Sequence, residues 1–224
     1  MKTSASRKTR RKVPNATDAK RERRRVFLAL GISALVGAPL AVFIKSKGQS
    51  PAGKFQLIDI TGADYGRDFL LPDLNGVVRS LKDFKGEVVV VFFGFTQCPN
   101  VCPTTLTELS QARRLMGVEG VGLRGIFVTV DPERDTVEVL KAYLANFDPT
   151  FVALRPTPEQ LKRLAADFRI HVRKTAGPTA TSYSMDHTAA SFVYDPEGRL
   201  RLYARYQAGA AALASDAKLL LKGV

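Results

Sequence analysis

The sequence predicts an α/β domain, a mixed sheet with helices on its faces, preceded by a single apolar segment long enough to cross a membrane. Three observations carry this prediction. Residues 87–95 form a β-branched and aromatic run without alternation, which is typical of a central strand covered on both faces. Strand-like and helix-like segments alternate after that run. Residues 26–44 form a stretch of 19 residues that carries no charge.

The segments of the domain are recognised from hydrophobic periodicity and from turn residues. In chain order, we expect a short strand entering an Asn-Gly turn at 69–76, a buried strand at 87–95, a helix with Pro103 at its first position, a buried strand at 121–130, a helix at 135–146, a short strand at 151–154, a helix capped by Thr157 and begun by Pro158, a hairpin of 190–194 and 200–206, and a helix at 210–222. A right-handed crossover between the first two buried strands places the loop after residue 95 at the carboxyl edge of the sheet, where the sites of α/β proteins form.

Positive charge is concentrated at the N-terminus. The chain of 224 residues carries +13, but residues 1–25 hold 11 Lys and Arg against two acids, which leaves only +4 for residues 26–224. A basic arm usually suggests nucleic acid. Here it directly precedes the apolar stretch, which as a helix would be about 28 Å long, close to the roughly 30 Å hydrocarbon core of a bilayer. We therefore interpret the arm as a topology determinant and expect no nucleic acid as a partner.

The positive-inside rule keeps the N-terminus in the cytoplasm and sends the rest of the chain across the membrane. This predicts a basic cytoplasmic tail at 1–25, a transmembrane anchor at 26–44, a polar linker at 45–57 and a domain at 58–224 on the periplasmic side of a bacterial-type inner membrane. Two alternatives are a buried core helix and an export signal, since Arg24-Arg25 ahead of the apolar run resembles the twin-arginine type. An export signal, like the anchor, would send the domain out of the cytoplasm.

Both cysteines of the chain, Cys98 and Cys102, fall in the loop after the strand at 87–95. Because Cys102 directly precedes the expected first helical residue, the helix N-terminus favours its thiolate. Pro99 and Pro103 restrict the backbone beside each thiol, and the three-residue spacing lets both sulfurs face one point. The bland alternative is a pair of buried, inert thiols. Thiolates are soft donors that suit Cu(I) or Zn(II).

A third donor would complete such a metal site. His187 lies in the polar stretch 183–188 ahead of the expected hairpin, a rim position where a histidine is more often a hydrogen-bonded structural residue. His171 follows a helix and is interpreted as a structural cation near the helix C-terminus. Met185 could lend a thioether, but we favour it as an apolar strand residue. The residues alone therefore leave the metal and its third ligand open.

Three stretches of the chain occur in the order found in one known family. They are residues 92–96 leading into Cys98-Pro99-Asn100-Val101-Cys102-Pro103, the stretch Val130-Asp131-Pro132-Glu133-Arg134-Asp135-Thr136, and Asp186-His187 located 85 residues beyond the second cysteine. At these residues the chain resembles the SCO family, also called SenC, of membrane-anchored copper proteins that serve cytochrome c oxidase assembly. The resemblance covers roughly residues 66–206 and implies a thioredoxin-like fold with Cys98, Cys102 and His187 as copper ligands.

The resemblance implies a metallochaperone that takes copper from an upstream carrier and delivers it to the dinuclear copper site in the copper-bearing subunit of cytochrome c oxidase. Cu(I) is the expected cargo, and Cu(II) with an added water is left open. The alternative is a thiol–disulfide oxidoreductase, with Cys98 and Cys102 as a redox pair that keeps the acceptor's cysteines reduced. Enzymatic activity therefore stays open. A third reading is an anchored adaptor whose thiols are incidental.

Residues beside the expected ligands receive supporting roles. Asp186 could orient His187 as a hydrogen-bond partner behind it. Residues 131–136 read as a loop and helix cap, in which Asp131-Pro132 makes the turn and Asp135 starts the next helix. Asn100 stands where many family members carry Asp, so this chain has no carboxylate at that position.

Overall fold

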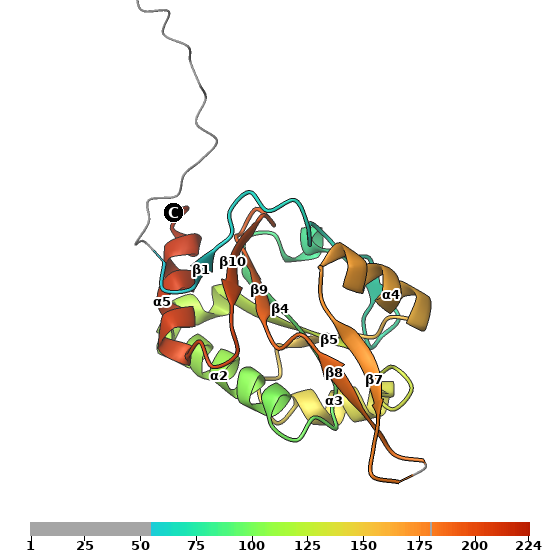
Figure 1. Cartoon of the computed structure of the whole chain (residues 1–224). Coiled ribbons are helices and arrows are strands. Elements are labelled where there is room, and N and C mark those ends of the chain that lie inside the picture. Colours follow the sequence, from blue (N-terminus) through green and yellow to red (C-terminus); the bar gives the residue numbers. More distant parts are fainter. Residues whose placement is uncertain (1–54, 180) are drawn as a thin grey trace, which may run out of the picture. The chain divides into compact units, whose positions relative to one another are not determined.

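Figure 1 shows the computed structural model of the chain, which describes residues 55–179 and 181–224. The expected basic tail at 1–25, the anchor at 26–44 and the linker residues 45–54 lie outside the described residues. Among the residues that are described, no helix has both the length and the apolar character that crossing a membrane requires. The anchor therefore stays a prediction from the sequence.

The elements of the domain follow the order that the sequence predicts from residue 87 onward, with one added hairpin. In chain order they are β1 (Ile58–Asp59), β2 (Leu71–Pro72), β3 (Val78–Arg79), the 3-10 helix η1 (Leu81–Phe84), β4 (Val88–Gly94), α2 (Val101–Leu115), η2 (Gly117–Gly122), β5 (Leu123–Thr129), α3 (Val137–Leu144), β6 (Val152–Leu154), α4 (Pro158–Asp167), β7 (Val172–Ala176), β8 (Tyr183–His187), β9 (Ser191–Tyr194), β10 (Leu200–Ala204) and α5 (Ala210–Leu221).

A six-stranded mixed sheet forms the centre of the domain, in the order β1-β10-β9-β4-β5-β6 (Figure 1). Strand β4 pairs in parallel with β5, and β5 in parallel with β6. On its other side β4 pairs antiparallel with β9, which continues antiparallel into β10. All seven residues of β4 are buried, as the uninterrupted apolar run predicts for a central strand. The prediction of a mixed sheet with helices on its faces is confirmed.

Helices cover both faces of this sheet (Figure 1). The crossovers through α2 and α3 run in the same direction along the sheet, so right-handed connections place both helices on one face, where α5 packs against α2. Helix α4 leads back toward β9 and covers the opposite face. Aromatic contacts of β4 agree with this arrangement. Phe93 packs on Phe168 at the end of α4, with ring centroids 5.0 Å apart, whereas Phe92 packs on Phe127 at 6.0 Å.

Two predicted helix starts differ from the structure. Helix α2 begins at Val101 rather than at Pro103, which lies within the first turn, where its missing N–H is not needed. Helix α3 begins at Val137, and the Thr136 side chain accepts the Val139 N–H at 3.3 Å as its cap. The prediction that Asp135 starts this helix is wrong, because the Asp135 carboxylate turns into the core and makes other bonds there.

The start of α4 is as predicted. Pro158 is its first residue, and the Thr157 hydroxyl accepts the Gln160 N–H at 3.2 Å while the Gln160 side chain accepts the Thr157 N–H at 2.8 Å. This reciprocal cap satisfies two amides that the helix itself leaves unpaired. The helix therefore starts where local side-chain chemistry alone dictates.

The hairpin of β7 and β8 is the element that the sequence analysis missed. These strands pair antiparallel as a separate two-stranded sheet, with Val172 opposite His187. None of their residues is fully buried, so they lack the apolar signal of the central strands. His187, expected in a polar stretch ahead of a hairpin, is in fact the last residue of strand β8.

The first described residues are fastened to the last helix. The Asp216 carboxylate on α5 is buried and accepts the backbone N–H groups of Gln56, at 2.9 Å, and Leu57, at 2.7 Å. Leu57 is itself part of the core. Residues 55–57, which we assigned to the linker, therefore pack onto the domain.

Candidate metal centre

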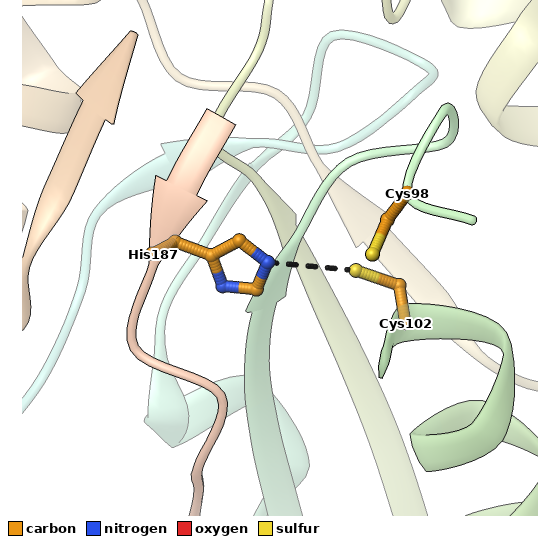
Figure 2. A group of neighbouring side chains, drawn as sticks. All are labelled: Cys98, Cys102 and His187. Atoms are coloured by element: carbon orange, nitrogen blue, oxygen red, sulfur yellow. Dashed lines mark hydrogen bonds between the residues drawn. The ribbon is translucent and has the colours of Figure 1, made fainter. Parts of the chain in front are cut away.

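Three side chains from distant parts of the chain meet at the carboxyl edge of β4 (Figure 2). Cys98 lies in the loop after β4, Cys102 in the first turn of α2, and His187 at the end of β8. Their ligand atoms, two sulfurs and one ring nitrogen, all lie within 4.8 Å of one another. The Cys102 Sγ to His187 Nε2 distance is 3.6 Å. The structure therefore brings together the three residues that the resemblance singled out.

Gly94, the last residue of β4, makes room for the centre. A Cβ at this position would lie 2.8 Å from Cys102 Sγ and 2.8 and 2.9 Å from ring carbons of Phe92 and Phe127. All three neighbours are buried, so none can move aside cheaply. The absence of a side chain here lets the Cys102 sulfur rest directly against the end of the central strand. The sequence analysis did not assign Gly94 a role.

The two thiols differ in exposure and in charge. Cys102 is fully buried, whereas Cys98 is only partly buried. The Cys102 thiol donates to the Cys98 sulfur, and the backbone N–H groups of Cys102 and Asn100 also donate to it, which lowers the pKa of Cys98 from 9.0 to about 3. The same hydrogen bond, together with burial, raises the pKa of Cys102. The expectation that the helix N-terminus favours the Cys102 thiolate is therefore wrong: the amides at the start of α2 favour the Cys98 thiolate.

The His187 ring is fixed in one tautomer by the backbone. Its Nδ1 lies 3.0 Å from the Thr188 carbonyl oxygen, and a carbonyl can only accept, so Nδ1 carries the proton. In the neutral form of the ring, Nε2 then carries the lone pair, and it faces the sulfurs, as a metal ligand must. Phe95 and Phe92 pack edge-on against the imidazole, with ring centroids 5.8 and 6.2 Å away. The bond to Thr188 therefore fixes the direction in which Nε2 points, and the two phenylalanine rings surround the imidazole with apolar atoms.

Asp186 does not have the role that we expected for it. Successive residues of a strand point to opposite faces, so the Asp186 carboxylate points away from His187. It bonds instead to His171 Nε2 at 3.2 Å and to Arg173 Nη2 at 3.3 Å, in an exposed cluster. His171 is held there by Asp186 and not at the C-terminus of α4. The Thr188 carbonyl takes the place behind His187 that the sequence analysis gave to Asp186.

The buried carboxylate of Asp135 holds the loop that carries Cys98. Asp135 is fully buried and accepts both the N–H and the hydroxyl of Thr96, the latter at 2.6 Å, as well as the hydroxyl of Thr129. Burial raises the pKa of Asp135. These bonds tie the loop that carries Cys98 to the end of β5. This role is not apparent from the sequence, because Thr96 lies 39 residues from Asp135 along the chain.

Tyr143 on α3 brings a polar atom close to the cysteines. Its hydroxyl is buried and has no hydrogen-bond partner within the described part of the chain. Burial raises the pKa of Tyr143, and the nearby Cys102 and Cys98 add to the effect. Its ring packs on Phe127, with centroids 5.9 Å apart. The sequence analysis used Tyr143 only as part of a helix.

The donor set of the centre suits a soft metal ion. Two thiolates and one imidazole are ligands that Cu(I) and Zn(II) both accept. A metal ion would displace the proton that Cys102 shares with Cys98, since only thiolates bind metals strongly. The space that Gly94 leaves, the lone pair of His187 and the ionised Cys98 all agree with this chemistry. The residues present therefore fit a copper ion.

Comparison with known proteins identifies the family. The model of the SCO1/SenC family matches residues 56–222. The chain belongs to the SCO1/SenC family. A SCO2-like protein of Rickettsia felis is 29% identical over 175 residues, which are 78% of this chain and 83% of that protein.

Solved SCO1/SenC structures share the architecture of this chain. The structure of Bradyrhizobium japonicum ScoI with copper bound is 36% identical, has a TM-score of 0.63, and covers 70% of this chain and 99% of that one. BsSco, described as a member of the Sco family of cytochrome c oxidase assembly proteins with a disulfide switch, is 22% identical, has a TM-score of 0.57 and covers 74% of this chain and 98% of that one. The thioredoxin-like fold implied by the resemblance is confirmed by these structures.

Proposed function

We propose that this SCO1/SenC protein is a copper metallochaperone that holds copper between Cys98, Cys102 and His187 and delivers it to the dinuclear copper site of cytochrome c oxidase. The observation that carries the proposal is the meeting of two sulfurs and one imidazole nitrogen within 4.8 Å at the sheet edge. The copper-bound ScoI of Bradyrhizobium japonicum, at 36% identity, supports copper as the metal. The description of BsSco as a member of an oxidase assembly family supports the pathway.

The unequal burial of the two thiols gives ligand exchange a direction. Cys98 is partly exposed and Cys102 is not, so an acceptor's thiolate reaches the metal from the side of Cys98. Cu(I) is stable with two or three soft ligands, so one bond can break as the incoming one forms. Copper binding displaces a proton from Cys102, and copper release returns it. Transfer thus needs no change in the oxidation state of the protein.

The proposed location follows from the apolar segment at 26–44. As a transmembrane anchor it would hold the domain on the extracytoplasmic side of the inner membrane, next to the nascent oxidase, and so raise the effective concentration of the two partners. The partners are then the copper-bearing oxidase subunit and an upstream copper carrier in the same compartment. Resistance of the full chain to extraction from membranes by alkaline carbonate would test the anchor, and release by that treatment would contradict it.

The alternative function is reduction of a disulfide in the acceptor, and the ionised Cys98 beside a protonated Cys102 favours it. The Cys98 thiolate would attack the acceptor's disulfide, and Cys102 would then resolve the mixed disulfide. The acceptor gains two thiols, while Cys98 and Cys102 lose two electrons and form a disulfide. Two-thiol chemistry of this kind makes no use of the imidazole at position 187.

Replacement of each of the two histidines in the membrane-bound full chain separates the functions. His187→Ala removes the nitrogen ligand and leaves both thiols, so we expect loss of copper retention and of oxidase assembly. His171→Ala is the matched control, because the His171 side chain is exposed and its imidazole bonds to Asp186 and to no other group of the described chain. Cys98→Ser should abolish both copper retention and disulfide reduction. Copper per chain, measured after dialysis, and oxidase activity in the same membranes are the readouts.

The outcomes of this experiment distinguish the metallochaperone, the disulfide reductase and the adaptor. Full copper retention and full oxidase assembly in His187→Ala would show that His187 is not a ligand and would overturn the proposal. Loss of copper with oxidase assembly preserved would favour the disulfide reductase. Oxidase assembly that survives Cys98→Ser would exclude both and favour the adaptor.

A further inference from the structure

The His187 hairpin is joined to the rest of the domain by few contacts. Strands β7 and β8 pair only with each other, outside the six-stranded sheet. At the base of the hairpin, the Thr188 N–H donates to the His171 carbonyl at 3.0 Å, and the His171 N–H donates to the Thr188 hydroxyl at 2.9 Å. These bonds close the hairpin but do not connect it to the cysteines. The distance from His187 to the sulfurs must therefore be set elsewhere.

The second fastening of the hairpin is at Tyr183, the first residue of β8. Its hydroxyl donates to Asp131 Oδ1 at 2.9 Å, and its backbone carbonyl accepts Arg134 Nη1 at 2.9 Å. The Arg134 guanidinium carbon lies 3.7 Å from the Tyr183 ring centroid, and Lys174 Nζ lies 3.8 Å from it. Arg134 also forms an ion pair with Asp131. We name Asp131, Arg134 and Tyr183 the clasp.

The same arginine contacts the cysteine loop. Arg134 Nη1 donates to Gln97 Oε1 at 3.0 Å, directly beside Cys98 in the chain, and its guanidinium lies 5.8 Å from the Phe95 ring centroid. Phe95 in turn packs edge-on against the His187 ring. The Arg134 side chain is 21% exposed, whereas its bond to Gln97 lies at the surface. One guanidinium therefore holds the cysteine loop and the hairpin together.

Strand geometry transmits this fastening to His187. Tyr183 and His187 are four residues apart on the same face of β8, because side chains of a strand alternate between faces. A strand held at Tyr183 and at Thr188 leaves His187 little freedom to approach or to leave the sulfurs. If the clasp opens, the imidazole is still held near Cys102 by the base of the hairpin, by the Lys174–Glu133 ion pair and by the packing of Val172 and Met185 on the core.

We propose that Arg134 and Tyr183 are positioning residues, which set the reach of His187 to the metal by clasping the hairpin to the cysteine loop. This inference rests on the proposed copper function. It adds an explanation of what holds the His187 ring at bonding distance from the metal. The motif at 131–136 thereby gains a role beyond the turn and cap that its sequence suggests. Release of the clasp converts a site of two sulfurs and one nitrogen into a site of two sulfurs.

The test uses the full chain with two substitutions and a matched control. Arg134→Gln removes the guanidinium, and Tyr183→Leu removes the ring and hydroxyl while leaving the ion pair of Arg134 and Asp131 in place. Arg173→Gln is the control, because Arg173 lies on the same hairpin but is exposed and bonds to Asp186 on the opposite face. Arg134→Lys keeps the charge without the forked geometry and should restore only part of the wild-type behaviour.

Two readouts are measured. The first is imidazole nitrogen coupling in the electron paramagnetic resonance spectrum of the Cu(II)-loaded chain, together with copper retention. We expect both clasp variants to lose this coupling and about 10–100-fold in copper affinity, as is typical when support behind a ligating histidine is removed. The second readout is amide hydrogen exchange of the metal-free chain. Exchange should accelerate in residues 183–187 and not in β9 or β10.

The outcomes distinguish this inference from the proposed function. A wild-type chain that binds no copper through sulfur and nitrogen defeats the proposed function, while hydrogen exchange still decides whether the clasp holds the hairpin. Unchanged nitrogen coupling and unchanged exchange in Tyr183→Leu overturn the clasp. Exchange that accelerates equally in β9 and β10 also overturns it, because it would show a general loss of stability. Should Arg134→Gln fail to fold, Tyr183→Leu decides alone.

Discussion

The cysteine loop and the β7–β8 hairpin supply the same metal centre, but they are held in different ways. The loop grows out of β4, a strand buried along its whole length at the middle of the sheet. The hairpin lies outside that sheet, and the residues of its strands are exposed or half-buried. Burial fixes the sulfurs, whereas polar contacts and the packing of a few partly exposed side chains fix the nitrogen.

This difference suits a protein that must both hold and release a metal ion. The buried sulfur of Cys102 stays in place because any displacement would disturb the core. The imidazole can withdraw when the clasp of Asp131, Arg134 and Tyr183 opens, since no bonds of the main sheet break. If the chain carries copper as proposed, the thiol pair stays preformed and the third ligand governs the hold on the metal. The predictions below test each side of this contrast.

The largest effect is expected where the core meets the cysteines. Gly94→Ala places a Cβ within 3.0 Å of Cys102, Phe92 and Phe127, and overpacking of this kind costs about 3 kcal/mol, the upper end of its usual range. Urea unfolding of the metal-free chain measures the cost. Gly122→Ala is the matched control, because its Cβ would meet only the end of the flexible Leu221 side chain. Equal unfolding midpoints for the two variants would show that the cysteine loop is not held by tight packing.

A smaller loss of stability is expected when the Asp135 carboxylate, which bonds to the cysteine loop, is removed. Asp135→Ala leaves the Thr96 N–H and the hydroxyls of Thr96 and Thr129 without their acceptor, at a cost of about 2 kcal/mol. Asp135→Asn keeps an acceptor oxygen and should cost less. Urea unfolding of both variants at neutral pH would show this order. Identical midpoints for Ala and Asn would mean that the bonds to Thr96 contribute nothing.

The pH dependence of the same carboxyl has a defined sign. Burial raises the pKa of Asp135 above its ordinary 3.8, so the folded chain binds its proton more tightly than the unfolded chain does. The stability that this group contributes is complete below pH 3.8 and is lost as the pH rises through the raised pKa. Asp135→Asn lacks this loss, so wild type should weaken relative to the Asn variant as the pH rises above 4. A constant difference between them would contradict the raised pKa.

The sequence predicts the cysteine side of the centre well for a physical reason. The apolar run at 88–94, the proline and cysteine spacing after it, and the capping residues of α4 are local signals that tertiary contacts reinforce. The hairpin of β7 and β8 lacks such signals, because none of its residues is fully buried and its pairing joins 172–176 to 183–187. The resemblance to a known family, rather than any pattern of burial, pointed to His187.

Two further details could not be predicted from the sequence, because they depend on the residue at which helix α2 begins and on how deeply the Asp135 side chain is buried. The helix was expected to begin one residue after Cys102, and its actual start at Val101 moves the amide donors onto Cys98. Asp135 was expected to start a helix, because its partner Thr96 lies 39 residues away and approaches it only after β4 and β5 pair.

The smallest effect is expected at Asp186, where adjacency in the sequence suggested a partner for His187. Its carboxylate is about half exposed and bonds to His171 and Arg173, so Asp186→Asn should change the stability by less than about 0.5 kcal/mol. Copper affinity should also stay near the wild-type value, far from the roughly 10–100-fold loss that follows when a partner behind a ligating histidine is removed. Copper competition with a chelator, run on wild type and Asp186→Asn side by side, measures this. A loss of tenfold or more would show that the Asp186 carboxylate reaches the histidine in the metal-bound protein, and the hairpin would then be held by its own charges rather than by the clasp.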